Sequence, residues 1–465
     1  MSIKGIGRVF ALGIAKEVTR GTAIASAAYW MPFADMSIEE KFDNAIQEEA
    51  YGIIEDSVGV SRVKNWAEGT FKIPLIDQSA RLLFYSIFGG YAHAAHGAEA
   101  AVYDHTFTVG QTAQHQSLTL FLHDPLAAVD YSHALGVIHK LEIAAELKKF
   151  VELTLSVKAL KGVAQSAFTP SILSENRFLP QYMTFAAAPT TAGLSKVVTA
   201  TGTAATTSSV TALSISTDLL KVGMTVTGTN IPASTTISVI VSATALTLSQ
   251  ATTGSASDFT FSSLSATGTA STSLHVTTLT GITTAVLQVG MTVTGPNIPA
   301  GATIAKIVSS TAFDLSIAST GAASTLSFGG ALVQLKSFKL SIDETSEDDE
   351  VLGSVAPVDF LNKEFKVEGS FEVIWQNETD AKTFALATPQ VAEALLIDIK
   401  NTDVTLGTSM NPELQITLDR VYYTEFSRPI KIKDLVYQTV KLKAVYSTAN
   451  SELAKFVLTN TVAAF

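Results

Sequence analysis

Two internal repeats constrain the fold of this chain more than any other feature of its 465 residues. The clearer repeat lies in the middle of the chain, where the segment from Val222 to Ala233 recurs, at an offset of 67, from Val289 to Ala300. Both segments contain Val-Gly-Met-Thr-Val-Thr-Gly and end in Asn-Ile-Pro-Ala. A repeat of this length indicates a folded module that is present twice in tandem.

The stretch around this repeat differs in composition from the rest of the chain. Residues 190–335 consist mainly of Thr, Ser, Ala, Gly and Val, and their six charges cancel, so the flanking sequence holds the whole net charge of −11. The six charged residues are Lys196, Lys221, Lys306, Asp218, Asp258 and Asp314. Alternating β-branched residues between Gly, Pro and Asn turns predict strands. We therefore expect two small all-β, Ig-like modules, at 190–263 and 264–333, and not a disordered linker.

A second, more diverged repeat relates the two flanks. Glu68-Gly69-Thr70-Phe71 matches Glu368-Gly369-Ser370-Phe371 at an offset of 300. Further along, residues 155–159 match residues 440–444 at an offset of 285. Because the matched segments occur in the same order, we expect a duplicated domain, with copy A at 1–189 and copy B at 334–465.

Each copy is expected to be mainly β-structure. Apolar and polar side chains alternate from Phe71 to Leu75 and from Phe371 to Trp375, which predicts a strand with one buried face in each copy. Residues 151–159 alternate in the same way. Their apolar members are expected in the core, and Thr154 and Ser156, with Thr439 and Lys441 of copy B, are expected on the opposite face.

One short helix is expected in each copy, directly after the first strand. In copy A, the apolar residues of 80–88 share one helical face, Asp77 or Ser79 is in position to cap the helix, and Gly89-Gly90 ends it. The residues of that face are Ala80, Leu83, Phe84, Ile87 and Phe88. In copy B, the corresponding cap is Asn377 or Thr379, and Pro389 ends the helix.

Composition excludes several classes of protein. The chain has 31 Lys and Arg against 42 Asp and Glu, so we expect no basic surface that binds nucleic acid through its phosphates. It has no cysteine, which removes disulfides and thiolate metal sites. No run approaches the ~18 consecutive apolar residues of a membrane-spanning helix. Arg8 and Lys16 interrupt the N-terminal apolar run, which argues against a signal peptide and favours a protein made in the cytoplasm.

Two clusters contain residue types that bind metals. His93 and His96 would lie on one face of a helix, and the acidic run between 343 and 350 offers carboxylates suited to calcium. Neither cluster has the remaining ligands and spacing of a known site, so a solvated His-rich loop and a solvated acidic loop are the favoured interpretations. The acidic residues are Asp343, Glu344, Glu347, Asp348, Asp349 and Glu350.

Enzymatic motifs are missing from the sequence. There is no phosphate-binding loop and no nucleophile elbow, and Gly5-Ile6-Gly7 is too short for a dinucleotide-binding fingerprint. We therefore predict no catalytic, cofactor-binding or metal-binding residues and no enzyme activity. A chain built from duplicated β domains is more naturally a structural subunit.

Several segments together resemble the tail tube (major tail) proteins of long-tailed bacteriophages. They are the Glu-Gly-[Ser/Thr]-Phe strand with its helix, the segment from Gly21-Thr22-Ala23 to Trp30-Met31-Pro32, and the long alternating strand near the end of each copy. The resemblance covers 1–189 and 334–465. The inserted modules resemble β modules often found in phage structural proteins, although many tube proteins lack an insert or carry it at the C-terminus.

The resemblance implies a virion protein of the phage tail. Tube proteins are β-sandwich domains whose sheets join across subunits into a barrel around a DNA channel, in rings of six domains. Two domains per chain then imply a homotrimer with pseudo-sixfold symmetry, stacked into a tube for genome ejection into the host. The implied further partners are a tape measure protein and a tail terminator, and DNA would pass an acidic wall without binding it.

Two further expectations concern the modules. If they project outward as decoration, their bulk would obstruct a contractile sheath, so we favour a non-contractile tail. A secreted surface-layer or adhesin-like protein is the main alternative function, because Thr- and Ser-rich β modules also occur in such proteins.

Overall fold

The protein is mainly β-structure. The computed structural model describes residues 6–49, 54, 57, 59–96, 99–127, 129–188, 194, 198–214, 220, 224–232, 235–242, 244–262, 265–270, 273–280, 284, 287, 289–299, 302–374, 392–408, 410–430, 435–448 and 450–464. Strands hold 60% of the residues and helices 4%, with one α-helix in the described ranges. None of the helices in these ranges has the length and apolar character needed to cross a membrane. The predicted β-rich class is confirmed.

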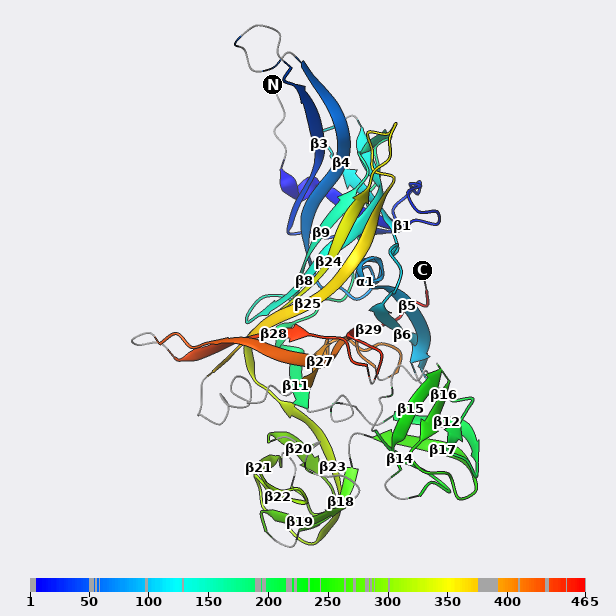
Figure 1. The fold of residues 1–465 in the computed structure, drawn as a ribbon, viewed down its shortest axis with the longest axis vertical. Helices are drawn as coiled ribbons and strands as arrows, with labels where there is room; N and C mark the ends of the chain where they lie inside the picture. The colour runs from blue at the N-terminus through cyan, green and yellow to red at the C-terminus, as the bar shows by residue number, and fades with distance from the viewer. Residues whose placement is uncertain are drawn as a thin grey trace.

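Outside the inserted modules, long strands such as those of the β3–β4 and β24–β25 hairpins occur together with much shorter strands (Figure 1). Up to the insert, the elements are η1 (Gly7–Val9), β1 (Ala11–Lys16), β2 (Tyr29–Met31), β3 (Asp35–Gln47), β4 (Gly59–Pro74), α1 (Ala80–Phe88), β5 (Gly89–His96), β6 (Glu99–Val109), β7 (Leu118–His123), β8 (Asp130–Glu146), β9 (Glu152–Ala159), β10 (Val163–Gln165), η2 (Pro180–Tyr182) and β11 (Met183–Ala188). After the insert they are β24 (Leu335–Asp349), β25 (Asp359–Ile374), β26 (Glu393–Lys400), β27 (Glu413–Ser427), β28 (Tyr437–Ala444) and β29 (Ala454–Asn460).

Each copy contributes four antiparallel strands to one sheet, and the pairing follows the two sequence offsets. The order is β3-β4-β9-β8 in copy A and β24-β25-β28-β27 in copy B. Phe71 lies opposite Leu155 in copy A, and Phe371 lies opposite Val440 in copy B. Residues that match in the sequence repeat therefore occupy the same places in the two sheets.

The irregularities of the two sheets also match. The pairing of β8 with β9 shifts between Ile138 and Lys140, and the pairing of β27 with β28 shifts between Tyr423 and Glu425, which is the offset of the sequence repeat in this region. The two long hairpins, β3–β4 and β24–β25, shift just after Asp43 and just after Thr345, at equivalent places. Because a β-bulge bends its strand and increases the local twist, the matched bulges place these distortions at equivalent positions of the two sheets.

The glycine of the repeated Glu-Gly motif allows a close approach of neighbouring backbones. A Cβ atom on Gly69 would overlap the carbonyl oxygen of Ser37 on β3. A Cβ atom on Gly369 would lie 2.9 Å from the carbonyl oxygen of Lys339, at the corresponding place on β24. Any other residue would push the hairpin strands apart, which gives this motif a structural reason.

A second sheet in each copy shows where the modules are inserted. In copy A, β2, β1, β7 and the first half of β8 pair in that order. In copy B, the end of β23 (Ala323–Leu332), β11, β26 and the first half of β27 pair in the same order. Met183–Ala188, which we expected at the end of copy A, thus takes the place of β1 in copy B. The modules interrupt copy B between the counterparts of β1 and β2.

The two modules have the same fold. Their strands are β12 (Val198–Ala205), β13 (Ser209–Val210), β14 (Thr225–Thr227), β15 (Ile237–Ser242), β16 (Ala245–Leu248) and β17 (Ser255–Ser262), then β18 (Ser265–Ala270), β19 (His275–Thr280), β20 (Met291–Thr294), β21 (Ile304–Ser309), β22 (Ala312–Leu315) and β23. In each module the first and third strands pair with the last strand, and the second and fourth strands pair with the fifth. In the second module β18 also pairs with β19. In Figure 1 both modules lie at the opposite end of the molecule from the tip of the β3–β4 hairpin.

The Asn of the repeated Asn-Ile-Pro segment has a structural reason in both modules. Asn230 and Asn297 have φ angles of 62° and 60°, a left-handed conformation that Asn tolerates better than most residues. Their side-chain amides donate to the carbonyl oxygens of Ser255 (2.7 Å) and Ala322 (2.8 Å), which are themselves equivalent positions of the two modules. Each Asn therefore ties its turn to the chain where the last strand of its module begins.

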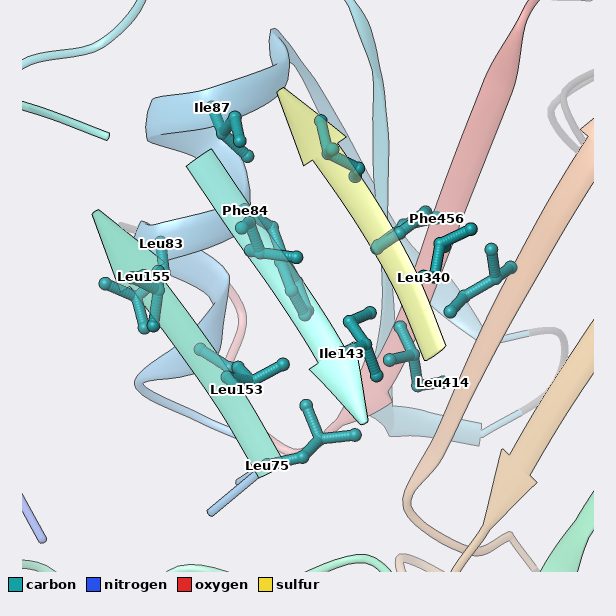
Figure 2. Close-up of a cluster of buried hydrophobic side chains, with 14 of the residues drawn as sticks. Leu75, Leu83, Phe84, Ile87, Ile143, Leu153, Leu155, Leu340, Leu414 and Phe456 are labelled. Atoms are coloured by element: carbon teal, nitrogen blue, oxygen red, sulfur yellow. The ribbon is translucent and has the colours of Figure 1, made fainter. Parts of the chain in front are cut away.

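Both copies share one hydrophobic core. Figure 2 shows Leu153 and Ile143 of copy A beside Leu340, Leu414 and Phe456 of copy B, with the side chains of α1 above them. This continuous cluster means that neither copy buries its apolar face without the other.

The helix α1 is more deeply buried than expected. The sequence predicts one apolar face, but only Tyr85 of α1 is partly exposed. Ser79 occupies the N-cap position without a capping bond, and Glu175 instead accepts the backbone N–H groups of Gln78 (2.9 Å) and Ser79 (2.7 Å). Gly89, with φ of 75°, ends the helix as predicted. The helix expected in copy B, with Asn377, Thr379 and Pro389, lies outside the described residues.

The alternating strand β9 generates a stability prediction. Leu155 is fully buried, whereas Thr154 is only partly buried on the opposite face. Leu155→Ala should lower the stability of the unassembled chain by about 2–5 kcal/mol through lost burial and an unfilled cavity. Thr154→Ala should leave the thermal midpoint nearly unchanged. Equal losses in thermal unfolding would mean that both faces of β9 are packed, and would contradict the one-sided sheet.

Candidate assembly edges and the polar face of the main sheet

The sheets of the two copies join edge to edge. β8 pairs with β24 over Lys140–Glu146, with Lys140 opposite Asp343 and Ile143 opposite Leu340. We call this pairing the internal joint. It creates one eight-stranded sheet, β3-β4-β9-β8-β24-β25-β28-β27, which we call the main sheet. The last sheet strand of copy A is thereby covered by the first sheet strand of copy B.

Ion pairs reinforce the internal joint. Lys339 of β24 lies 2.8 Å from Glu142 of β8. Asp348 of β24 accepts hydrogen bonds from Lys64 (2.6 Å) and Lys158 (2.9 Å), which belong to β4 and β9 of copy A. Burial opposes the ionisation of Asp348, but these lysines outweigh it and hold its pKa below the usual value. One carboxylate of copy B therefore forms ion pairs with two different strands of copy A.

A second contact between the copies centres on Asp359, at the start of β25. Arg20, in the loop after β1, donates from Nε to Asp359 at 2.8 Å and from its terminal nitrogen to the carbonyl oxygen of Phe360 at 2.9 Å. The other terminal nitrogen donates to the carbonyl oxygen of His115. The Gln114 amide also donates to Asp359, at 2.6 Å. This planar set of charged hydrogen bonds fixes copy A loops on copy B.

His115 and Glu344 form a buried ion pair beside this contact. Their Nδ1 and Oε1 atoms are 3.1 Å apart, and both side chains are almost fully buried. The two ring nitrogens of His115 also lie within 3.1 Å of the carbonyl oxygens of Ile87 and Gly110, which can only accept. Burial opposes the charged ring, but Glu344 and the two carbonyls prevail and raise the pKa of His115. Burial raises the pKa of Glu344.

The main sheet ends in two strands that pair on one side only within the described residues. β3 pairs with β4, and the part of β27 from Tyr422 to Ser427 pairs with β28. We call β3 and 422–427 the free edges, in the sense that no strand among the described residues pairs with their outer side. Side chains on these strands do have partners, as Tyr423 donates to Glu393 at 2.8 Å. β3 is exposed along most of its length, with Phe42 and Ile46 each about half exposed. Such edges promote pairing with another chain.

The polar face of the main sheet has a mixed charge. Lysines and carboxylates of neighbouring strands form ion pairs across it: Lys72–Glu152 (2.7 Å), Lys339–Glu142 (2.8 Å), Lys441–Glu425 (2.6 Å) and Lys443–Glu368 (3.7 Å). Thr154, Ser156 and Thr439, expected on this face, are partly exposed there, and Lys441 is exposed. The acidic wall expected for a channel is therefore not a feature of this face.

The histidines are not in the solvated loop that we expected. His93 and His96 lie on the strand β5, not on a helix, and His96 contacts Asp104 at 2.7 Å. His105, on β6, is buried between Tyr91 and Asn460, and burial lowers its pKa to about 4. Pairing of β6 with β29 of copy B, which local sequence does not reveal, buries His105, whereas His93 on β5 is exposed. No set of three or more His, Asp or Glu residues suited to a metal occurs among the described residues.

The acidic run also lies on a strand and not in a loop. Asp343 to Asp349 belong to β24, where Glu344 meets His115 and Asp348 meets two lysines. The sequence gives no sign of these contacts because the partners lie in the other copy, far away along the chain. The repeat is the sequence signal that could have located them. It shows that the acidic run belongs to the counterpart of the strand β3, and therefore to a strand rather than a loop.

Comparison with known proteins places the chain in no family. No protein-family model matches it. No curated protein matches it at a significant level.

The His115–Glu344 pair predicts a pH dependence. A raised histidine pKa stabilises the fold fully below the unfolded value of about 6.5, and this stabilisation is lost as the pH rises through the folded pKa. Burial also raises the pKa of Glu344, and the stability that this shift contributes begins to fall at lower pH, from the unfolded value of 4.5 upwards. The thermal midpoint should therefore fall as the pH is raised above neutral.

His115→Gln should make that fall shallower. A residual slope is expected from His96, whose pKa Asp104 also raises. Thermal unfolding followed from about pH 6 to about pH 9 tests this. An unchanged slope in the variant would show that His115 is not the titrating group.

Proposed function

We propose that this chain is a structural subunit that self-associates edge to edge into closed rings, and that the rings stack into the tail tube of a long-tailed phage. The observation that supports this most is the internal joint. Within one chain, the last strand of one four-stranded sheet already pairs with the first strand of an equivalent sheet. The free edges of the main sheet are the counterparts of the two strands in that joint, so the same pairing can be repeated between chains.

The proposed ring contains three chains. Each copy contributes four strands in matched register, so the two copies serve as equivalent positions in a ring of six. In this proposal both copies are tail-tube-type sandwich domains, and the modules are Ig-like decoration outside the tube. Their place at one end of the molecule, away from the β3–β4 tip, supports an outward position (Figure 1). We also propose that the tail is non-contractile.

The proposed lumen carries DNA without binding it. If the polar face lines the channel, its lysines are held in ion pairs with Glu side chains, which leaves few free cations for phosphates. In this proposal DNA passes without binding because the lysines of the sheet are neutralised by neighbouring glutamates, and not because an acidic wall repels it. A tape measure protein and a tail terminator remain the proposed partners in the virion.

Electron microscopy and native mass spectrometry of the purified protein test the proposal. We expect rings or tubes with a central hole, and a closed assembly of three chains. Six chains per ring would contradict the role of the duplication. A protein that stays monomeric at high concentration would contradict the proposed function and favour the adhesin-like alternative.

Deletion of the modules tests their proposed role. Residues 190–333, the bounds expected from the sequence, would be replaced by a short Gly/Ser linker. The structure sets the replaced segment at 190–329, because Ala331 and Leu332 pair with β11. The paired ends lie side by side, so a linker as short as the loop between β1 and β2 should close them. Ring formation should persist, and its loss in a folded variant would make the modules part of the assembly.

A further inference from the structure

The internal joint provides a template for the register of a joint between two chains. On β3 and β24, equivalent residues differ by 302 in number, since Met36 lies opposite Phe71 and Phe338 lies opposite Phe371. On β8 and β27 they differ by 285, as the matched bulges show. Applied to Lys140 opposite Asp343, these offsets place Glu425 of one chain opposite Lys41 of the next.

We propose that the free edges carry a charge order that selects β27 of one chain for β3 of another and rejects the edges of the internal joint. This inference rests on the proposed self-association and adds the identity and register of the partner edges. The internal joint also contains Glu142 of β8 beside Lys339 of β24, but the counterparts of these two residues on the free edges are the uncharged Ser427 and Ser37. At the Lys140–Asp343 pair of the internal joint, the cation lies on β8 and the anion on β24. In the joint between chains the signs are reversed, with the anion on β27 and the cation on β3.

The reversal penalises each incorrect pairing. If β3 of a second chain replaced β24 on β8, Lys41 would lie opposite Lys140. If β24 of a second chain paired with β27, Asp343 would lie opposite Glu425. Like charges directly opposite each other destabilise a strand pair, whereas opposite charges stabilise it. The duplicated edges would otherwise be interchangeable, so this difference disfavours assemblies in which the edges of the internal joint and the free edges exchange partners.

The surrounding side chains suit the same register. Glu39 lies 2.7 Å from Lys41 on β3, and Glu425 lies 2.6 Å from Lys441 on β28. Pairing of the edges would therefore place Lys41, Glu425 and Lys441 in one row across the joint, with Glu39 beside Lys41 along β3. Each charge already has a partner in the single chain, so the row sets the choice of edge more than the strength of binding.

The opposite face of the joint supplies apolar contact. Met36, partly buried against the core, would lie opposite Ile430, which is 74% exposed in the single chain. The corresponding pair in the internal joint is Phe338 and Ala145, which are both buried. Closure of the joint thus buries side chains that the single chain leaves in water.

Charge exchange at the two positions tests the proposal. Lys41→Glu and Glu425→Lys should each weaken every joint about fivefold, which is on the order of 100-fold for a ring of three joints. The double variant should restore rings. Lys149→Glu makes the same change in net charge as Lys41→Glu at an exposed turn residue away from the edges, and should assemble normally. Unchanged thermal midpoints of the unassembled chains would show that the variants are folded.

A mixture of the two single variants gives a sharper result. The glutamate introduced at position 41 of one variant matches the lysine introduced at position 425 of the other, and the reverse contact is unaltered, so the variants should associate alternately. Three chains cannot alternate around a closed ring. Every mixed ring of three therefore keeps one mismatched joint, so native mass spectrometry should show more closed trimers than either variant gives alone and about fivefold fewer than the wild type. Closed trimers at the wild-type level would overturn the charge order.

Cysteine cross-linking tests the register independently of charge, because the chain has no cysteine of its own. Glu39→Cys with Ser427→Cys should form a disulfide between chains, whereas Glu39→Cys with Glu425→Cys should not, since disulfides require Cα atoms within about 7 Å. Rings that form without the first cross-link would overturn the register and leave the proposed function intact. Absence of rings in the wild-type protein would instead contradict the proposed function.

Discussion

Backbone hydrogen bonding at the edges of a sheet is the constraint on which the rest of this structure depends. A strand at an edge exposes N–H and C=O groups that pair readily with another strand. In this chain the edge of copy A at β8 is covered by β24 of copy B, and two edges of the same kind remain at β3 and β27 in the described part of the chain. Duplication therefore satisfies one edge inside the chain and leaves the pair that a second chain can satisfy.

The internal joint also makes the two copies one folding unit. They share a continuous core, and β6 of copy A pairs with β29 of copy B, with Phe107 opposite Phe456. Asp348 and Asp359 of copy B form ion pairs with lysine and arginine side chains of copy A. A carboxylate paired in this way is costly to leave without its partner. These contacts hold the two copies in one fixed relative position. A fixed position is needed if an edge of this chain is to set the register of the next chain.

The repeats allowed much of the fold to be predicted, and long-range contacts explain the remainder. The sequence offsets reappear in strand registers, in bulges and in the turns at Asn230 and Asn297. Alternation predicted the buried face of β9. Local sequence could not show that β11 replaces β1 in copy B, nor that Arg20 meets Asp359, because these contacts join distant parts of the chain. The histidines and the acidic run were assigned to solvated loops for the same reason.

A high-resolution cryo-electron microscopy map of the assembled protein tests the central claim most directly. The account predicts a wall of three main sheets joined edge to edge, with internal joints alternating with joints between chains around the ring. At each joint between chains, Lys41 of β3 should lie opposite Glu425 of β27. A map in which β3 faces solvent, or pairs with a strand other than β27, would contradict it.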